Sequence, residues 1–453
     1  MQSSRTAALG PPMSHLPEDN FPAPPQDLRT RSAGLPASLI ALFLAACGGG
    51  ADTAATPSAA TADAAATAQA GTLQNRHPTP SPSPAPTPAP APTPAPTPAP
   101  APAPPTSTTI NAALGLPNRL LGGLGANNEM SDITAQNIKP DIIDTYLVGV
   151  GSGSWTTWNS PSGAYVTQVA ANDKAIGAVP MFTLYQMAAN GDGNLSGIDN
   201  ATFMTSYWAQ VKLMYQKIAA TGQPTLVNLE PDFWGYVQLQ APGGDPTQLA
   251  AQVSIMPECA SLPNTAVGIA GCLLTLGRTY APTARIGFPP SFFGETATSV
   301  GTFMAALGAN KADYIVAQTS DRDAGCFEAG TLSECTGRGT GPFYWDENNV
   351  STPNFTQSLS DWSTTRSLLG NLPILFWQTP MGVPSATPGG TTGHFRDDHV
   401  HYMLTHPTQY TAIGTFAIVF SAGAASQTTI TTDGGQFAKQ FSAYLANPAP
   451  YPN

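Results

Sequence analysis

The chain has 453 residues, a formal net charge of −11 and only 10% charged residues. This length allows one large domain or two small ones. Because the chain is acidic and has no clusters of Lys and Arg, we expect no nucleic-acid partner.

The N-terminal segment, residues 1–46, has the features of an export signal. Basic residues precede a short apolar run that is too short to anchor stably in a bilayer. The sequence Leu-Ala-Ala-Cys at positions 44–47 resembles the lipobox of bacterial lipoproteins, whose cysteine is lipidated. The resemblance implies a lipid anchor on Cys47 in the bacterial cell envelope. Because Gly48 rather than Asp follows, it implies the outer membrane or cell surface. An ordinary signal peptide is the alternative.

Residues 47–109 are low in complexity, with Ala and Thr first and then a Thr-Pro-Ala-Pro run from His77 to Pro105. Such a composition does not form a packed core and favours extended polyproline II, which rises by about 3.1 Å per residue. We therefore expect a linker that acts as a stalk and holds the following domain away from the membrane.

From residue 110 to 453, short apolar runs alternate with amphipathic segments. The runs indicate strands buried on both faces, at residues 119–125, 142–150, 178–185, 225–230, 285–289, 314–318, 374–378 and 412–420. The clearest helical pattern covers Ala201–Ala220, and others are expected at 296–309, 355–369, 398–405 and 435–446. This alternation predicts an α/β fold, a TIM-type (β/α)₈ barrel.

A doubly wound open sheet is the alternative fold, and it would more often carry a phosphate-binding loop after its first strand. The Gly-rich sequence at 121–125 lacks the GxGxxG spacing. We therefore interpret these glycines as a sign of close packing near one end of a barrel rather than as a nucleotide loop.

Four cysteines of this domain form two close pairs in the sequence, Cys259 with Cys272 and Cys326 with Cys335. An even number at short spacing after an export signal predicts two local disulfides, although three connectivities are possible. Reduced thiols are the alternative. Because no CxxC or nearby His spacing accompanies the cysteines, we expect no zinc site.

The stretch from 224 to 236 combines a predicted strand with acidic and aromatic residues. An apolar run leads into Glu230 and Asp232, which Trp234 and Tyr236 follow. If the extended geometry continues, both carboxylates point to the same side. Carboxylates beside aromatic rings suit glycoside cleavage, in which they move protons and stabilise an oxocarbenium-like transition state. Alternatively, Glu230 caps the next helix and Asp232 fixes a turn.

Barrel enzymes carry their active sites at the C-terminal ends of the strands. Several predicted strands are followed there by polar and aromatic residues: Trp155, Trp158, Tyr185, Gln186, Asn190, Asp192, Phe292, Phe293, Glu295, Asp321, Arg322, Asp323, Tyr344, Trp345, Trp377 and Gln378. Large aromatics on such loops suggest stacking on a sugar, or alternatively a hydrophobic plug under long loops. We expect substrate contacts from Trp155, Tyr185, Trp234, Tyr236, Trp377 and Gln378.

The segment from 394 to 401, His-Phe-Arg-Asp-Asp-His-Val-His, is a second stretch rich in charged residues and histidines. Its last two histidines, with the aspartates, could ligate a metal. However, an HxH pair points apart on a helix, and this segment is typical of a helix start. We therefore expect no metal, and we interpret Arg396 and His399 as ligands of substrate hydroxyls, with an aspartate as the helix N-cap.

The predicted barrel and this site layout resemble the (β/α)₈ glycoside hydrolases. In their large retaining clan, an Asn-Glu-Pro motif after the fourth strand supplies the acid/base, and a Glu after the seventh strand is the nucleophile. This chain has Asn228-Leu229-Glu230-Pro231, with one residue inserted, and Gln378 near the place of the nucleophile. The resemblance therefore implies Glu230 as the acid and leaves the second carboxylate open.

Three mechanisms fit these residues. In the first, Glu230 is the general acid and Asp321, Asp323 or Asp398 activates water, an inverting reaction with carboxyls about 6.5–9.5 Å apart. In the second, Glu230 and Asp232 cooperate, and burial among aromatics raises the pKa of the protonated partner. In the third, the site binds a glycan without cleaving it.

We therefore expect a lipid-anchored barrel that hydrolyses a poly- or oligosaccharide outside the cytoplasm, as a monomer and without a cofactor. The alternative is a non-catalytic, glycan-binding surface lipoprotein on a degenerate barrel, which Gln378 favours. A purely structural envelope protein is a third class. Serine hydrolysis is disfavoured because no GxSxG motif follows a predicted strand.

Overall fold

The computed structural model describes residues 106–125, 130–319, 354–382, 399–421 and 428–451, together with residues 128, 324, 327, 345 and 348–350. The predictions for the export signal, the lipidated Cys47, the stalk and the pair Cys326–Cys335 lie outside these residues, as do those for Asp321, Asp323, Arg396 and Asp398. Helix α1 (Ser107–Leu114) begins inside the stretch predicted as a linker. None of the described helices is long and apolar enough to cross a membrane.

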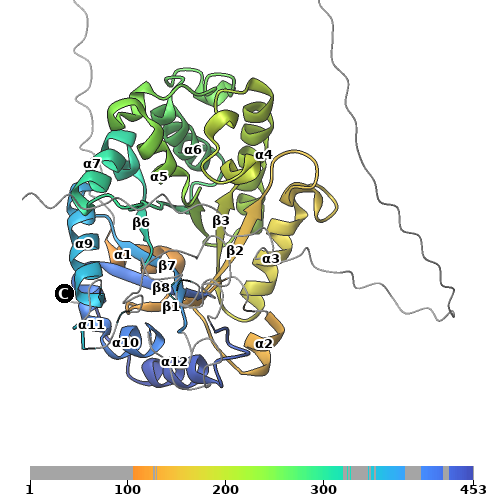
Figure 1. The fold of residues 1–453 in the computed structure, drawn as a ribbon. Coiled ribbons are helices and arrows are strands. Elements are labelled where there is room, and N and C mark those ends of the chain that lie inside the picture. The colour runs from red at the N-terminus through yellow and green to blue at the C-terminus, as the bar shows by residue number, and fades with distance from the viewer. Residues whose placement is uncertain are drawn as a thin grey trace, which may run out of the picture. The chain divides into compact units, whose positions relative to one another are not determined.

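Eight strands of the described chain form a closed barrel in the order β1 to β8 (Figure 1). Each strand pairs in parallel with the next, and β1 pairs with β8 to close the ring. The (β/α)₈ prediction is confirmed, and the open-sheet alternative is excluded. The strands are β1 (Leu121–Leu124), β2 (Ile142–Val148), β3 (Val179–Tyr185), β4 (Leu226–Leu229), β5 (Arg285–Phe288), β6 (Tyr314–Ala317), β7 (Ile374–Pro380) and β8 (Thr415–Ser421).

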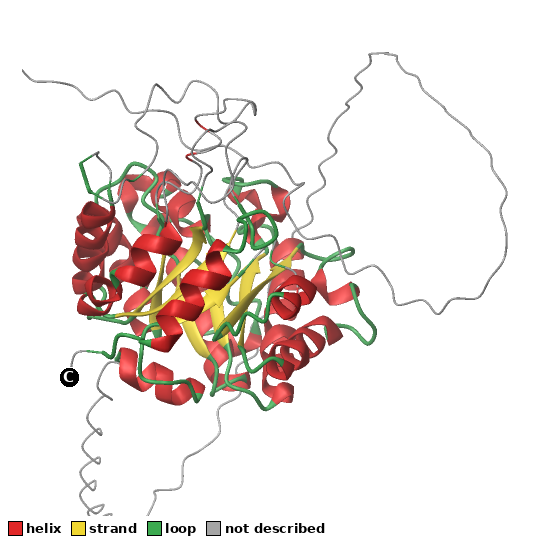
Figure 2. Ribbon diagram, turned by 90° about the horizontal axis from the view of Figure 1, so that it is seen from below, coloured by secondary structure: helices red, strands yellow, loops and turns green. Residues whose placement is uncertain are grey.

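The helices form an outer layer around the strands (Figure 2). Besides α1, the described α-helices are α2 (Met130–Ala135), α3 (Ala164–Ala175), α4 (Ala201–Thr221), α5 (Phe233–Gln240), α6 (Ala266–Tyr280), α7 (Ala297–Leu307), α9 (Phe355–Leu368), α10 (His399–Thr405), α11 (Pro407–Ala412) and α12 (Gln436–Ala446). The sequence pattern did not predict α1, α2, α3, α5, α6 or α11. Helix α3 has no clear apolar stripe, and α6 is apolar on most of its surface.

Two apolar layers stabilise the barrel. Outward-facing strand residues pack against the helices, while inward-facing residues such as Leu226, Val316 and Leu375 fill the interior. Ile110 and Leu114 of α1 belong to the same inner cluster. Helix α1 therefore closes the end at which the strands begin, and the opposite end is left for a site.

The Gly-rich first strand packs closely against a helix. A Cβ atom at Gly122 would lie 2.2 Å from Cε2 of Phe441 in α12. Only a glycine fits this approach between strand and helix. The prediction of close packing at 121–125 is confirmed, because these residues belong to β1 and its end rather than to a phosphate loop.

Cys259 and Cys272 form the predicted disulfide, which joins η7 (Pro257–Cys259) to α6. Beside it, Lys212 of α4 pairs with Glu258 at 2.7 Å, and the Tyr280 hydroxyl of α6 donates to the same carboxylate. These contacts join α4 and α6 on the outside of the barrel.

Candidate functional site

A polar layer lies inside the barrel, between the apolar interior and the C-terminal end. Asp144 of β2 accepts hydrogen bonds from the Thr183 hydroxyl of β3 at 2.6 Å and from the Trp377 indole N–H of β7 at 2.8 Å. Asn228 of β4 donates to the Thr183 hydroxyl at 3.2 Å. Burial raises the pKa of Asp144 to about 6, although the hydrogen bonds from Thr183 and Trp377 lower it.

Tyrosine and glutamine side chains follow this layer toward the mouth of the barrel. Tyr146 packs on Trp377 with ring centroids 5.8 Å apart and meets Tyr185 edge-on at 6.1 Å. Gln378 donates to the Tyr146 hydroxyl and accepts a hydrogen bond from Gln318 at 3.3 Å. These side chains come from β2, β3, β7 and the end of β6, so they connect opposite sides of the mouth.

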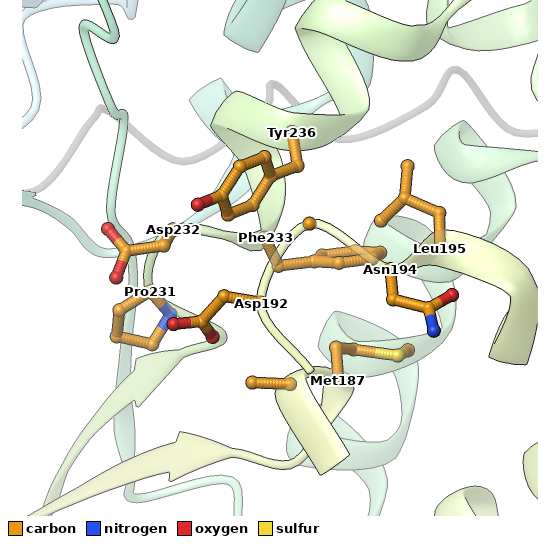
Figure 3. Close-up of a pocket in the computed structure, with 10 residues that line it drawn as sticks. Met187, Asp192, Asn194, Leu195, Pro231, Asp232, Phe233 and Tyr236 are labelled. Atoms are coloured by element: carbon orange, nitrogen blue, oxygen red, sulfur yellow. The ribbon is translucent and has the colours of Figure 1, made fainter. Parts of the chain in front are cut away.

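A shallow hollow lies at the ends of β3 and β4 (Figure 3). It encloses about 220 Å³, part of which is open solvent. In Figure 3 the carboxylates of Asp192 and Asp232 lie on one side of the hollow, and the Tyr236 hydroxyl points to that side. The lining residues come from the connection after β3 and from the start of α5: Met187, Ala188, Asp192, Gly193, Asn194, Leu195, Pro231, Asp232, Phe233 and Tyr236.

Two tyrosine hydroxyls lie close enough to Asp192 and Asp232 for both negative charges to affect their pKa values. Tyr185 donates a 2.6 Å hydrogen bond to Asp192. Burial, followed by the negative charges of Asp232 and Asp192, raises the pKa of Tyr185 well above its ordinary value. Burial and the same two charges raise the pKa of Tyr236 to about 12. Both phenols therefore remain protonated at neutral pH and can donate hydrogen bonds within one site.

Tyr236 is held in place by its neighbours. Its ring packs against Phe293 with centroids 4.9 Å apart. On the other loop, a Cβ atom at Gly193 would lie 3.0 Å from Cε1 of Tyr236, and the φ angle of Gly193 is +72°. A side chain at position 193 would therefore crowd the Tyr236 ring and strain the backbone.

The carboxyl groups of Glu230 and Asp232 point in different directions. Strand β4 ends at Leu229, and the φ angles of Glu230 and Asp232 are +56° and +63°. Because the extended geometry does not continue, the expectation that both carboxylates point to the same side is wrong. Asp232 lines the hollow, whereas Glu230 is fully buried and does not line it.

The Glu230 carboxyl is bound to the backbone after β3. Its Oε2 atom accepts hydrogen bonds from the N–H groups of Gln186 and Met187, both at 2.9 Å. Burial raises the pKa of Glu230 to about 8, although these two bonds and the neighbouring Tyr207 hydroxyl lower it. The group is therefore mostly protonated at pH 7 and has no access to the hollow in this structure.

Trp155, Trp234 and Trp377 were expected to stack on a sugar, and the structure corrects this expectation. All three are buried. Trp234 lies in α5, where its indole N–H donates to the Leu229 carbonyl at 2.7 Å. Trp155 belongs to the outer core and Trp377 to the barrel interior. Packing between strands and helices leaves no ring face for a ligand, so the alternative reading as a hydrophobic plug describes them better.

His399, expected to bind substrate hydroxyls, is also buried. It begins α10, and its ring lies 5.6 Å from that of Trp345 and 4.9 Å from that of Phe355. The expected contact is therefore wrong for this structure, because aromatic side chains enclose the ring. Within the described ranges, no three His, Cys, Asp or Glu residues are placed to hold a metal.

The structure brings Tyr185, Tyr236, Gln378 and Asp232 together at the barrel mouth, and their contact with substrate stays a prediction. Sequence reasoning placed Asp192 after the third strand without assigning it a role. It also missed Asp144, Tyr146 and Gln318. The period-two pattern of β2 could have found the first two of these, because Asp144 and Tyr146 share the inward face with Ile142.

No protein-family model matches the chain, and no curated protein is similar to it. Similar solved structures include a double mutant of Cellulomonas fimi endo-β-1,4-mannanase, 12% identical over 76% of this chain and 74% of that chain, with a TM-score of 0.42. A GH5 xyloglucan-specific β-1,4-glucanase from a ruminal metagenomic library is 13% identical over 76% and 98%, with a TM-score of 0.46. D-psicose 3-epimerase from Clostridium cellulolyticum H10 is 10% identical over 72% and 99%, with a TM-score of 0.39. The strand pairing itself shows the barrel, and similarities this low carry no argument about activity.

Proposed function

We propose that the chain hydrolyses a glycosidic bond of a poly- or oligosaccharide at the C-terminal mouth of its barrel. The observation that supports this best is the convergence of Asp192, Asp232, Tyr185 and Tyr236 beside one hollow. Glycoside hydrolysis needs two carboxyl groups, one to protonate the leaving oxygen and one to attack or to activate water. The tyrosine hydroxyls can orient these groups and bind sugar hydroxyls.

The two carboxyl groups have different surroundings, which suggests their roles. Asp192 accepts a 2.6 Å hydrogen bond from Tyr185, an arrangement that suits a group acting as an acceptor or base. Asp232 lines the hollow directly after β4, and we assign it as the second carboxyl group that the reaction needs. Asp321, Asp323 and Asp398 stay predictions as further water-activating groups.

The test measures reducing ends released from a broad panel of polysaccharides by the full chain. Asp232→Asn and Asp192→Asn are each expected to lower turnover at least 100-fold, because general acid–base catalysis contributes about 10²–10⁴-fold. Asp245→Asn is the matched control, since Asp245 is half-buried, accepts from the Thr247 N–H in η6 (Pro246–Gln248) and does not line the hollow. Full activity in both Asp232→Asn and Asp192→Asn would contradict the assignment.

Glycan binding without cleavage is the second candidate, and one observation favours it. The end of β7 carries Gln378, whose amide is engaged by the Tyr146 hydroxyl and Gln318. An amide cannot serve as a nucleophile at the anomeric carbon. This candidate predicts a saturable change in intrinsic fluorescence on saccharide titration, with no reducing ends from any glycan.

We also propose that Cys47 carries a lipid that anchors the chain in the bacterial cell envelope. The lipobox-like sequence at 44–47 and the Pro-rich run after it support this proposal. Incorporation of a labelled fatty acid into the wild-type chain, and none into Cys47→Ala, is the expected result. Equal labelling of both chains would contradict it.

A further inference from the structure

The two carboxylates of the hollow lie on two different loops. Asp192 belongs to the connection after β3, and Asp232 follows β4. Between them, Glu230 contacts the first loop from the second. Its Oε2 atom accepts the N–H groups of Gln186 and Met187 at 2.9 Å each.

The main chain of Glu230 strengthens the same connection. Its N–H donates to the Leu184 carbonyl of β3 at 2.8 Å, so pairing between β3 and β4 continues one residue beyond β4. The side chain of Glu230 then accepts hydrogen bonds from the backbone of Gln186 and Met187, which follow Leu184 along the first loop. Met187 begins η3 (Met187–Asn190), and Gln186 before it makes no side-chain cap. Glu230 supplies the missing acceptor from the other loop.

The loop held in this way forms one wall of the hollow. Met187 and Ala188 line it, and the chain turns back at Gly191, whose N–H donates to the Ala188 carbonyl at 2.8 Å, just before Asp192. The hydroxyl of Tyr207 from α4 lies near enough to the Glu230 carboxyl for each group to affect the pKa of the other. Glu230 is thus fully buried, and its carboxyl is bonded to the loop.

We propose that Glu230 is a positioning residue that fastens the loop carrying Asp192 to the loop carrying Asp232, rather than the group that protonates the substrate. Its effect on turnover rests on the proposed function, whereas its effect on the loop does not. Misplacing a catalytic group by about 1 Å can cost roughly 100-fold in rate, so such a connection matters for the chemistry.

Glutamine is a close replacement for this particular glutamate. Burial keeps the carboxyl mostly protonated at neutral pH, and glutamine has the same length and one acceptor oxygen for the two N–H groups. Alanine removes the acceptor. A general acid behaves in the opposite way, because an amide cannot donate the proton that the leaving group needs.

The first arm of the test is amide hydrogen exchange at Gln186 and Met187 in the full chain. Glu230→Gln is expected to keep exchange within about threefold of the wild type, and Glu230→Ala to increase it at least tenfold. Glu258→Ala is the matched control, because this glutamate is also hydrogen-bonded but lies on the outside, against Lys212. Protected amides in Glu230→Ala would overturn the proposal.

If Glu230→Ala does not fold, Glu230→Asp replaces it. Aspartate keeps a carboxyl but is one methylene shorter, so the two amides are expected to lose protection there too. Retained protection in Glu230→Asp would then overturn the proposal.

The second arm is turnover of a glycan that the wild type cleaves. Glu230→Gln is expected to keep at least a third of the activity, and Glu230→Ala to lose about 100-fold. An inactive Glu230→Gln with protected amides would overturn the positioning role and make Glu230 the proton donor. A wild type that cleaves nothing would contradict the proposed function, while the exchange arm would still decide whether Glu230 fastens the loops.

Discussion

Trp377 of β7 donates its indole N–H to Asp144 of β2 at 2.8 Å, across the interior of the barrel. Tyr146, two residues after Asp144, and Gln378, directly after Trp377, contact each other at the mouth. The buried hydrogen bond between Trp377 and Asp144 therefore lies directly beneath the contact at the mouth. Asp144 is also a titratable group inside the barrel.

Asp144 makes the stability of the fold depend on pH. Its pKa is raised from 3.8 to about 6 by burial, so the folded state binds the proton more tightly than the unfolded state. Its contribution to the free energy of unfolding is complete below about pH 4. This contribution falls by about 3 kcal/mol as the pH rises through 6. Glu230 and Asp173, whose pKa values are raised to about 8, act with the same sign.

We therefore expect the free energy of unfolding of the wild type to fall between pH 4 and pH 8, and Asp144→Asn to reduce this fall by about 2–3 kcal/mol. Urea unfolding at the two pH values measures the difference. The same pH dependence in both proteins would contradict the role given to Asp144.

The Tyr185–Asp192 bond is expected to matter for the ligand. Tyr185→Phe removes a 2.6 Å hydrogen bond to a carboxylate. Because bonds to charged groups contribute about 1.5–3 kcal/mol, we expect turnover or saccharide affinity to fall about tenfold or more. Tyr280→Phe is the control, since it removes a phenol bond to Glu258 on the outside of the barrel. Equal effects of the two variants on turnover or affinity would contradict a site at the mouth.

Gly193 is expected to control the position of the Tyr236 ring. Gly193→Ala places a Cβ 3.0 Å from that ring at a φ of +72°, whereas Gly191→Ala, at a φ of +98°, meets nothing within 4 Å. Both variants strain the backbone of the same loop, by about 1 kcal/mol or more. Titration with a saccharide that the wild type binds should show weaker binding for Gly193→Ala than for Gly191→Ala. If the two bind equally well, the Tyr236 ring does not contact the ligand.

The disulfide is expected to stabilise the outer layer without affecting the site. Replacing Cys259 and Cys272 by serine should lower the free energy of unfolding by about 2–4 kcal/mol, because the bond restricts the unfolded chain. Turnover of the folded variant should be unchanged. A urea midpoint equal to that of the wild type would show that the bond does not stabilise the fold.

The barrel could be predicted because its strands are local signals. Runs such as Val179–Tyr185 and Thr415–Ser421 are buried on almost their whole length, and their apolar composition shows this directly in the sequence. The helix at Ala201–Thr221 has a clear apolar stripe. Helix α6 was missed because most of its side chains are apolar and buried, so little polar surface sets its apolar stripe apart in the sequence.

The details of the site depend on features that composition does not encode. The positive φ angles of Glu230 and Asp232 turn the two carboxylates apart, and only the fold shows this. Trp234 follows an acidic pair in the sequence, but α5 rotates it into the core. The polar residues after the strands therefore correctly predicted that the site lies at the C-terminal end of the barrel. For several side chains, the orientation predicted from them was wrong.

The most direct test compares Asp232→Asn with Glu230→Gln for reducing-end release from the polysaccharide panel. The wild type and Glu230→Gln should both release product, and Asp232→Asn should release at least 100-fold less. An active Asp232→Asn together with an inactive Glu230→Gln would contradict the account, because Glu230 would then be the proton donor despite its burial.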